Sequence, residues 1–392
     1  VDRLDDSQTV IDNRSGNEPS SFNTSNISDL KRMNTSFYGD WIHKLKKKGA
    51  EFSIGSHYTF YDSDQGQDVQ TDFLDMNGAL TGENDFTTLS QQKINLYSVQ
   101  TDYSTPVGKA SRFETGLRYA GIMSRNTISQ EGFDRNQSGI NPTEAGTFDY
   151  DESIYAAYMS FNGKWNDWRL SSGIRAEQTE TKGKLDINTI TNTNSYLEFF
   201  PSVSLQYLKG DKHEYSFRYY RRITRPRYNN INPFQFFQSN NVISEGNPDL
   251  LPSIRTRFAV GYTYDNTYTL EFIYDNNENQ FSELVFQDNE ANLLRFISSN
   301  LESSYSYGLD FTFNKDITNF WNSYVLATYF FKKDGFNDLS SGQLIENSIG
   351  TWIARTNQSF TLFADRSLFI DLQFFYRSAT VSGNRRTDGI ST

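Results

Sequence analysis

The chain has 392 residues, no cysteine and a formal net charge of −11 at pH 7. Its acidic balance argues against nucleic acid as a partner, and the lack of thiols excludes disulfide scaffolds, thiolate metal sites and cysteine nucleophiles. No stretch approaches the roughly 20 apolar residues that a membrane-spanning helix needs, although 16% of the residues are aromatic.

Apolar and polar residues alternate along much of the chain, which predicts strands with one apolar and one polar face. In Glu51–Tyr61, for example, Phe52, Ile54, Tyr58 and Phe60 share one face. We predict about fourteen antiparallel strands, near residues 35–45, 50–61, 93–105, 111–124, 149–163, 168–182, 196–208, 213–225, 255–264, 267–286, 291–314, 319–332, 347–364 and 367–380. The segments 267–286 and 291–314 are long enough to be split by a bulge.

The connections between these strands alternate in length. Short turns such as 46–49, 107–109 and 209–212 follow every second strand, and longer polar links such as 62–93 and 125–148 follow most of the others. The link near 287–290 is short, so we expect its flanking strands to project outward as a hairpin. Short turns at one end and long loops at the other are typical of an outer-membrane barrel. The predicted fold is therefore an all-β, antiparallel transmembrane β-barrel.

Strand length and tryptophan placement agree with this fold. About ten residues at about 3.3 Å each, tilted near 45°, rise roughly 23 Å, close to the apolar band of such a barrel. Trp41, Trp165, Trp168 and Trp321 lie within a few residues of short turns, where they could form an aromatic girdle. The alternative is that they are ordinary aromatics flanking turns.

Several segments, taken in order, resemble TonB-dependent outer-membrane receptors, and more narrowly their outer membrane β-barrel family branch. The resemblance extends from about residue 30 to 380 and rests on the following stretches: Ile154–Tyr158, Gly173–Glu177, Phe200–Ser202, Tyr219–Pro226, Asn232–Phe234 and Gly246–Pro252. The motif residues that carry it best are Arg222, Pro226, Asn232, Pro233, Gly246, Asn247 and Pro248.

The resemblance implies an importer in the cell outer membrane that takes up selected ligands through its barrel. Barrels of this kind have about 22 strands. Because we recognise no plug domain, TonB-box-like segment or aromatic-ended closing strand, we expect residues 1–392 to form one barrel domain that is part of a larger barrel. The implied partners are outer-membrane lipid, TonB acting through a plug domain outside this chain, and a surface lipoprotein.

Two other functions fit the residues. One is a passive pore, or a structural barrel subunit of an envelope complex. The other is a secreted all-β adhesin or glycan-binding module. An enzyme is not expected, because none of the three histidines, His43, His57 and His213, lies near the predicted outer rim where a catalytic group would be needed. No cofactor is expected either.

Candidate ligand-binding residues lie on and after the predicted strand 213–225. Arg225 and Arg227 would reach the outer rim, where they could bind anionic substrate groups or lipid phosphates. The alternative is that the arginines pair with lumen carboxylates such as Glu177 and Glu198. Arg221 shares the apolar parity of the strand, so we expect it to lie beyond the apolar band.

The long link that follows could contribute aromatic ligand contacts. Tyr228, Phe234, Phe236 and Phe237 could stack on a sugar or chelate, or could form the hydrophobic core of the loop itself. Metal binding has weaker support: Asp62, Asp64 and Asp68 place carboxylates on a glycine-containing link that could hold Ca²⁺, but the EF-hand spacing fails. We therefore expect a solvated acidic loop there.

Overall fold

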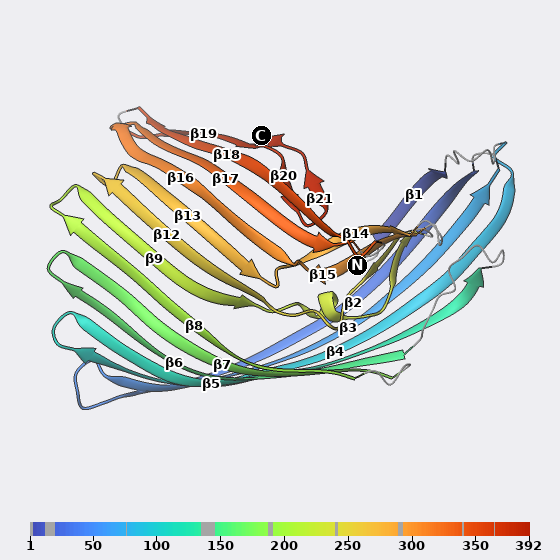
Figure 1. The fold of residues 1–392 in the computed structure, drawn as a ribbon, viewed down its shortest axis with the longest axis horizontal. Coiled ribbons are helices and arrows are strands. Elements are labelled where there is room, and N and C mark those ends of the chain that lie inside the picture. The colour runs from blue at the N-terminus through green and yellow to red at the C-terminus, as the bar shows by residue number, and fades with distance from the viewer. Residues whose placement is uncertain are drawn as a thin grey trace.

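The computed structural model describes residues 3–11, 20–75, 77–134, 146–186, 191–239, 242–288, 293–338, 341–363 and 365–392. Its main element is an antiparallel sheet of sixteen strands, ordered β1 to β9, β12, β13, β16 to β19 and β22. The sheet is curved into a trough (Figure 1). No pairing between its two end strands occurs among the described residues.

The strands of this sheet follow the chain order. They are β1 (Arg3–Ile11), β2 (Ser20–Lys44), β3 (Glu51–Leu74), β4 (Leu80–Val107), β5 (Ser111–Asp134), β6 (Gly146–Trp165), β7 (Trp168–Leu185), β8 (Thr191–Lys209), β9 (His213–Thr224), β12 (Ser253–Tyr264), β13 (Tyr268–Glu278), β16 (Ser303–Thr318), β17 (Trp321–Asn337), β18 (Leu344–Leu362), β19 (Leu368–Arg377) and β22 (Ile390–Ser391). All fourteen predicted strands are present, and β1 and β22 are additional. The all-β, antiparallel fold is confirmed.

The short turns gather at one end of the sheet, on the left of Figure 1. They connect β2 to β3, β4 to β5, β6 to β7, β8 to β9, β12 to β13, β16 to β17 and β18 to β19. Several of their residues adopt left-handed backbone conformations, such as Gly49 with φ of 81° and Gly210 with φ of 65°. Glycine permits this conformation without steric cost, so these turns can reverse the chain within a few residues.

The predicted long loops 62–93 and 125–148 are wrong in part, because the strands continue far beyond the apolar band. β3 runs to Leu74 and β4 starts at Leu80, and the two strands remain paired from end to end. Likewise β5 extends to Asp134 and β6 begins at Gly146. The sequence signal was an alternation between apolar and polar residues. Outside a membrane both faces of a hairpin can be exposed to water. The alternation of apolar and polar residues is then lost, although the backbone hydrogen bonds between the strands continue.

Apolar side chains on the outward face form the band that the sequence predicts. Trp165 pairs with Trp168 next to a short turn, and Trp41 pairs with Ile54 on the same face. Trp165 and Trp41 are largely exposed, as lipid-facing residues in an isolated chain should be. Along β6, ten residue steps separate Trp165 from the outward Tyr155, which at about 3.3 Å per residue and a 45° tilt gives a band of roughly 23 Å.

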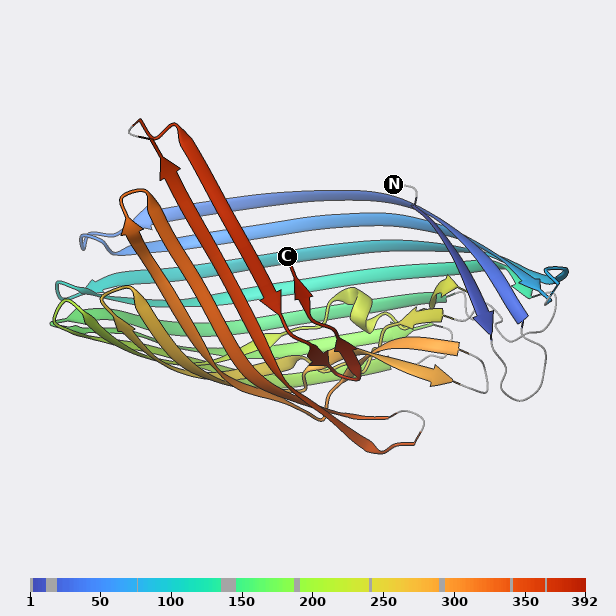
Figure 2. The ribbon, with the colours of Figure 1, turned by 90° about the horizontal axis from the view of Figure 1, so that it is seen from above.

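A second, four-stranded sheet lies inside the trough. It has the order β10 (Phe236–Ser239), β11 (Val242–Glu245), β15 (Leu293–Asn300) and β14 (Phe281–Asp288), with β11 and β15 parallel. A short helix, α1 (Tyr228–Ile231), precedes it. Figures 1 and 2 both place these elements within the arc of the main sheet. We call residues 225–252 together with β14 and β15 the cap.

The predicted segments 267–286 and 291–314 are each split in two, into β13 with β14 and β15 with β16. Their hairpin does not project outward as expected. Instead β14 and β15 fold inward, because their apolar residues Leu284, Phe286 and Ile297 pack with Leu301 and Phe336 in a buried cluster. A separate two-stranded sheet, β20 (Thr380–Ser382) and β21 (Arg385–Thr387), lies beside them.

Candidate functional site: the capped inner face

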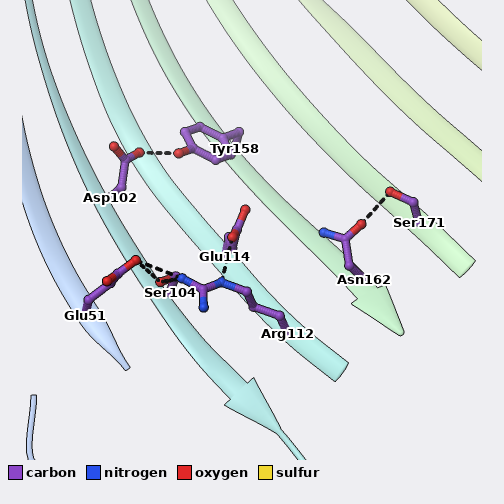
Figure 3. A network of polar contacts seen from close by, with 8 residues as sticks. All are labelled: Glu51, Asp102, Ser104, Arg112, Glu114, Tyr158, Asn162 and Ser171. Carbon is purple, nitrogen blue, oxygen red and sulfur yellow. Dashed lines mark hydrogen bonds and ion pairs between the residues drawn. The ribbon is translucent and has the colours of Figure 1, made fainter. Parts of the chain in front are cut away.

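The inner face of the trough is polar near the short turns (Figure 3). The Arg112 guanidinium donates to Glu114 at 2.8 Å and to Glu51 at 2.9 Å, and it also donates to the Ser104 hydroxyl. These four residues come from β3, β4 and β5. Their charges are therefore satisfied across three strands rather than left free in the interior.

A glycine shapes the next row of this face. Asp102, Gly116 and Tyr158 lie opposite one another on β4, β5 and β6. The Tyr158 hydroxyl donates to the Asp102 carboxylate across the middle strand (Figure 3). A Cβ on Gly116 would lie 2.6 Å from an Asp102 oxygen and 2.7 Å from the Tyr158 ring. The absence of a side chain at Gly116 is what lets the tyrosine reach its partner.

The opposite wall carries a dense set of arginines. Arg255 and Arg257 both hold the buried Asp275, at 2.6 Å each, and Arg218 pairs with Glu271. Arg222 is exposed on this face, and its guanidinium lies 4.3 Å from the centre of the Tyr220 ring. This stacked cation has no carboxylate within 4.0 Å among the described residues, so it is available to an anion.

Arg225 fastens the start of the cap to the inner face of β7. Its guanidinium donates to Glu177 at 2.6 Å and to the Thr179 hydroxyl at 3.0 Å, and Glu152 lies 3.8 Å away. Glu177 is only 6% exposed and also accepts from Arg175 at 2.5 Å. The sequence left open whether Arg225 meets a ligand or lumen carboxylates. The structure places it against carboxylates, so its ligand role stays an untested prediction.

Arg221 occupies the point where β8 and β9 separate. Their ladder ends at Ser202 and Tyr220, and residues 221–224 pair only with β12. Pro201 follows on the β8 side, where it has no N–H to offer a ladder. The Arg221 guanidinium donates to Glu198 at 2.5 Å and to the Phe199 carbonyl at 3.0 Å. That Arg221 lies beyond the apolar band stays a prediction.

The family motif residues hold the cap together. The Gly246 N–H donates to the Asn232 carbonyl at 2.9 Å, and the Asn247 N–H donates to the Asn230 carbonyl at 2.7 Å. A Cβ on Gly246 would lie 2.5 Å from the Asn232 oxygen, so only glycine allows this approach. The two motifs, Asn232–Phe234 and Gly246–Pro252, therefore interlock as one unit. Pro226, Pro233 and Pro248 are half-buried within or beside it.

The predicted ligand-binding aromatics contribute mainly to a hydrophobic cluster. Phe234 is buried there, and Tyr228 and Phe236 pack against it. Burial raises the pKa of the Tyr228 hydroxyl above its ordinary value. Arg227 is exposed at the start of α1. The side chain of Phe237 lies outside the described residues. Ligand binding by these residues remains a prediction.

Residues that the sequence reasoning missed connect the cap to the wall. Ile128 and Phe148, on the inner faces of β5 and β6, pack with Ile231, Phe234 and Leu250 of the cap. Val69 and Phe86, on the inner faces of β3 and β4, pack with Ile243 of β11 in the same way. At these four positions the inner face of each strand is apolar, whereas nearer the short turns the inner face is polar. This change from polar to apolar residues on the inner face was the sequence signal that could have predicted the contact with the cap.

The cap also contacts the other wall of the trough, because Phe336 of β17 packs with Leu284 and Ile297 of the cap. Further bonds join the cap to the β20–β21 hairpin. The Asn384 side chain donates to the Val285 carbonyl at 2.5 Å and accepts from the Val285 N–H at 3.1 Å. The Ser282 and Ser382 hydroxyls are 3.2 Å apart. Together with the contacts to β3 to β6, the packing against Phe336 shows that the cap crosses the trough from one side to the other.

The three aspartates considered for Ca²⁺ are part of β3 rather than of a loop. Asp62, Asp64 and Asp68 lie along one face of the extended strand β3. On one face of a strand, successive side chains are about 6.6 Å apart. A single ion bound at 2.3–2.6 Å needs oxygens that wrap around it. Within the described ranges, no group of three His, Asp or Glu residues is placed to hold a metal ion.

Among the described residues, no helix is long and apolar enough to cross a membrane. The strand ladder, the outward apolar band and the polar inner face define an outer-membrane β-barrel protein. The model of the outer membrane protein beta-barrel family matches residues 43–392. This chain belongs to that family. No curated protein sequence matches it.

Solved structures with a similar fold include an iron transporter and two receptors. The FrpB iron transporter from Neisseria meningitidis matches 100% of this chain and 72% of its own, with a TM-score of 0.50 and 10% identity. The ferripyoverdine receptor of Pseudomonas aeruginosa has a TM-score of 0.49 and 12% identity, and the chain covers 62% of its length. The ferric-catecholate import receptor Fiu from E. coli K12 has a TM-score of 0.49, 12% identity and coverage of 100% and 70%. At these identities the likeness concerns the fold alone.

Family membership places this chain in the outer membrane, in contact with outer-membrane lipid. It agrees with the prediction that the chain is not an enzyme, because the family consists of membrane barrels. The secreted adhesin or glycan-binding module is set aside for the same reason. The chain spans about 62–63% of the length of the first receptors matched, so what the whole protein does is a matter for proposal.

Proposed function

We propose that residues 1–392 form one barrel domain of a TonB-dependent importer that selects its ligand at the outer mouth. The observation that carries this proposal is the cap, which crosses the trough at the end away from the short turns and packs against both walls. An obstruction of this kind suits an importer that binds a ligand before admitting it. A passive pore needs an open aqueous channel instead.

The exposed arginines suggest the charge of the ligand. Arg222 on β9 and Arg227 at the start of the cap are exposed, and neither has a carboxylate within 4.0 Å in the described parts of the chain. Guanidinium groups bind carboxylates and other oxyanions through paired hydrogen bonds. We therefore propose that the ligand is anionic. Ferric chelates are the first candidates, because the matched receptors are named for ferripyoverdine and ferric catecholate.

Uptake by cells that express the intact gene tests this function. The probes are a radiolabelled ferric catecholate, a ferric hydroxamate and a neutral maltooligosaccharide, each measured with and without a protonophore. The expected result is gene-dependent accumulation of a ferric chelate that the protonophore abolishes, because TonB coupling requires an energised inner membrane. Uptake that survives the protonophore would favour the passive pore. The absence of gene-dependent uptake for all three probes would overturn the proposed ligand class.

Variants then locate the ligand contact. Arg222→Ala and Arg227→Ala should each weaken binding of the accepted chelate about 10-fold or more, as expected for the loss of one charge-assisted interaction of about 1.5–3 kcal/mol. Arg366→Ala is the matched control, because Arg366 is equally exposed but lies in the β18–β19 turn at the opposite end. Equal effects of all three substitutions would show that the two arginines are not ligand contacts.

A further inference from the structure

A cluster of cations lies on the outward face, just past the apolar band. Lys93, Arg125, Lys182 and Lys184 come from β4, β5 and β7 and line a hollow of about 430 Å³. Asp149 and Asp151 of β6 also line it, so the lining holds four cations and two carboxylates. An excess of positive charge at this place contrasts with the chain as a whole, whose formal net charge is −11.

The strand register fixes the level of this hollow. Lys93, Arg125, Asp149 and Lys184 lie opposite one another in a single row across β4 to β7. On the side of the short turns, outward tyrosines follow within a few residues. The Tyr119 ring packs at a tilt against Tyr97 and Tyr155, with ring centroids 5.8 Å and 5.0 Å apart. Tyrosines mark the boundary between the hydrocarbon and the headgroups in membrane barrels, so the row of charges lies at headgroup level.

The lysines of the hollow are free to bind a ligand. Arg125 is engaged, since its guanidinium donates to Asp149 at 2.6 Å and 3.2 Å. Lys93, Lys182 and Lys184 have no carboxylate within 4.0 Å among the described residues. Asp62 faces Lys93 across the ladder, and Asp151 faces Lys182, without forming such a contact. Three unpaired ammonium groups around one hollow are suited to the oxygens of a phosphate.

We propose that this hollow binds the phosphate of an outer-leaflet lipid headgroup. Lys93, Lys182 and Lys184 donate to the phosphate oxygens, and Arg125 remains bound to Asp149 and shapes one side. The acyl chains of the lipid descend over Met123 and the Tyr97–Tyr119–Tyr155 ladder, which are outward and partly or largely exposed. A free phosphate ion could make the same hydrogen bonds to the lysines, but it has no acyl chains to contact the adjacent apolar surface. The site is independent of the uptake function proposed above.

Native mass spectrometry of the intact protein in detergent micelles tests the proposal, with phosphatidylglycerol as the probe lipid. The variant is Lys93→Glu, Lys182→Glu and Lys184→Glu combined. Each basic residue near an anionic lipid surface contributes about 1 kcal/mol, so the triple variant should retain the lipid on the order of 100-fold less tightly. Binding to the wild-type protein should weaken as ionic strength rises.

The matched control replaces Lys46, Lys48 and Lys212 with Glu. These lysines are exposed near short turns at the other end of the strands, and the control changes the net charge by the same amount. We expect the control to keep lipid binding, and both variants to keep the heat-dependent gel shift of a folded barrel. Equal loss in both triple variants would overturn the proposal, because the effect would then be one of overall charge.

Competition separates the two sources of phosphate. Inorganic phosphate in large excess should displace little of the bound phosphatidylglycerol, because it lacks the acyl chains that contact the apolar surface. Complete displacement by inorganic phosphate, or equal retention of an uncharged diacylglycerol by wild-type protein and variant, would each overturn the assignment to a lipid headgroup.

Discussion

Replacing Gly246 with alanine should release the cap while leaving the barrel folded. The added Cβ would lie 2.5 Å from the Asn232 carbonyl oxygen and 2.8 Å from the Asn230 carbonyl carbon and oxygen. All three atoms belong to the backbone, so none can rotate away. The two motif segments of the cap must therefore move apart.

The cost of that movement follows from the bonds it breaks. The Gly246–Asn232 and Asn247–Asn230 backbone hydrogen bonds measure 2.9 Å and 2.7 Å. Each contributes about 1 kcal/mol net, and a buried carbonyl left unpaired costs about 1–3 kcal/mol more. We expect the cap to lose about 3–5 kcal/mol of local stability, which corresponds to about 150- to 5,000-fold easier opening.

Hydrogen exchange of the purified protein measures this opening directly. Amides in residues 228–250 should exchange faster by that factor, and amides in the membrane band of β5 to β7 should not change. Gly66→Ala is the control, because a Cβ there meets nothing within 4 Å. If Gly246→Ala left the exchange of the cap as slow as in Gly66→Ala, the interlocking of the two motifs would be refuted.

Two further substitutions test the inner face. Glu177→Gln removes the charge that holds Arg225, and the lost charge-assisted bond contributes about 1.5–3 kcal/mol. Amides of the cap should therefore exchange about 10- to 100-fold faster. Unchanged exchange would show that Arg225 does not anchor the cap. Gly116→Ala should push the Tyr158 ring off Asp102 and lower barrel stability by about 1–3 kcal/mol in a thermal melt. A melt equal to the wild type would show that the glycine is not needed for that contact.

The membrane band was predictable because the membrane imposes a rule on every residue in it. Lipid on one face and water on the other force the strict alternation seen in Glu51–Tyr61, so all fourteen strands could be located. Above the band that rule ends. Val69 and Phe86 face inward although their strands have apolar outward faces lower down, because their partner is the cap rather than lipid.

The site was less predictable, since its contacts join residues far apart in the chain. The sequence offered Glu177 as a possible partner for an arginine, but its bond to Arg225 spans 48 residues and depends on the inward turn after β9. The sequence allowed the motif Gly246–Pro248 to be matched to a family, but it did not reveal the structural role of the motif. Its role is visible only when the Asn230 and Asn232 carbonyls lie against it.

The central claim is that the cap folds into the trough and packs against its inner face. Because the chain has no cysteine, the double variant Val69→Cys/Ile243→Cys introduces the only thiols, at two residues that share one buried cluster. We predict that a short bifunctional maleimide joins them in isolated outer membranes, and that it does not join the control pair Val69→Cys/Met123→Cys, whose side chains lie on opposite faces of the sheet. Failure of the first pair to cross-link, with both thiols freely labelled by a bulky maleimide, would contradict the inward cap.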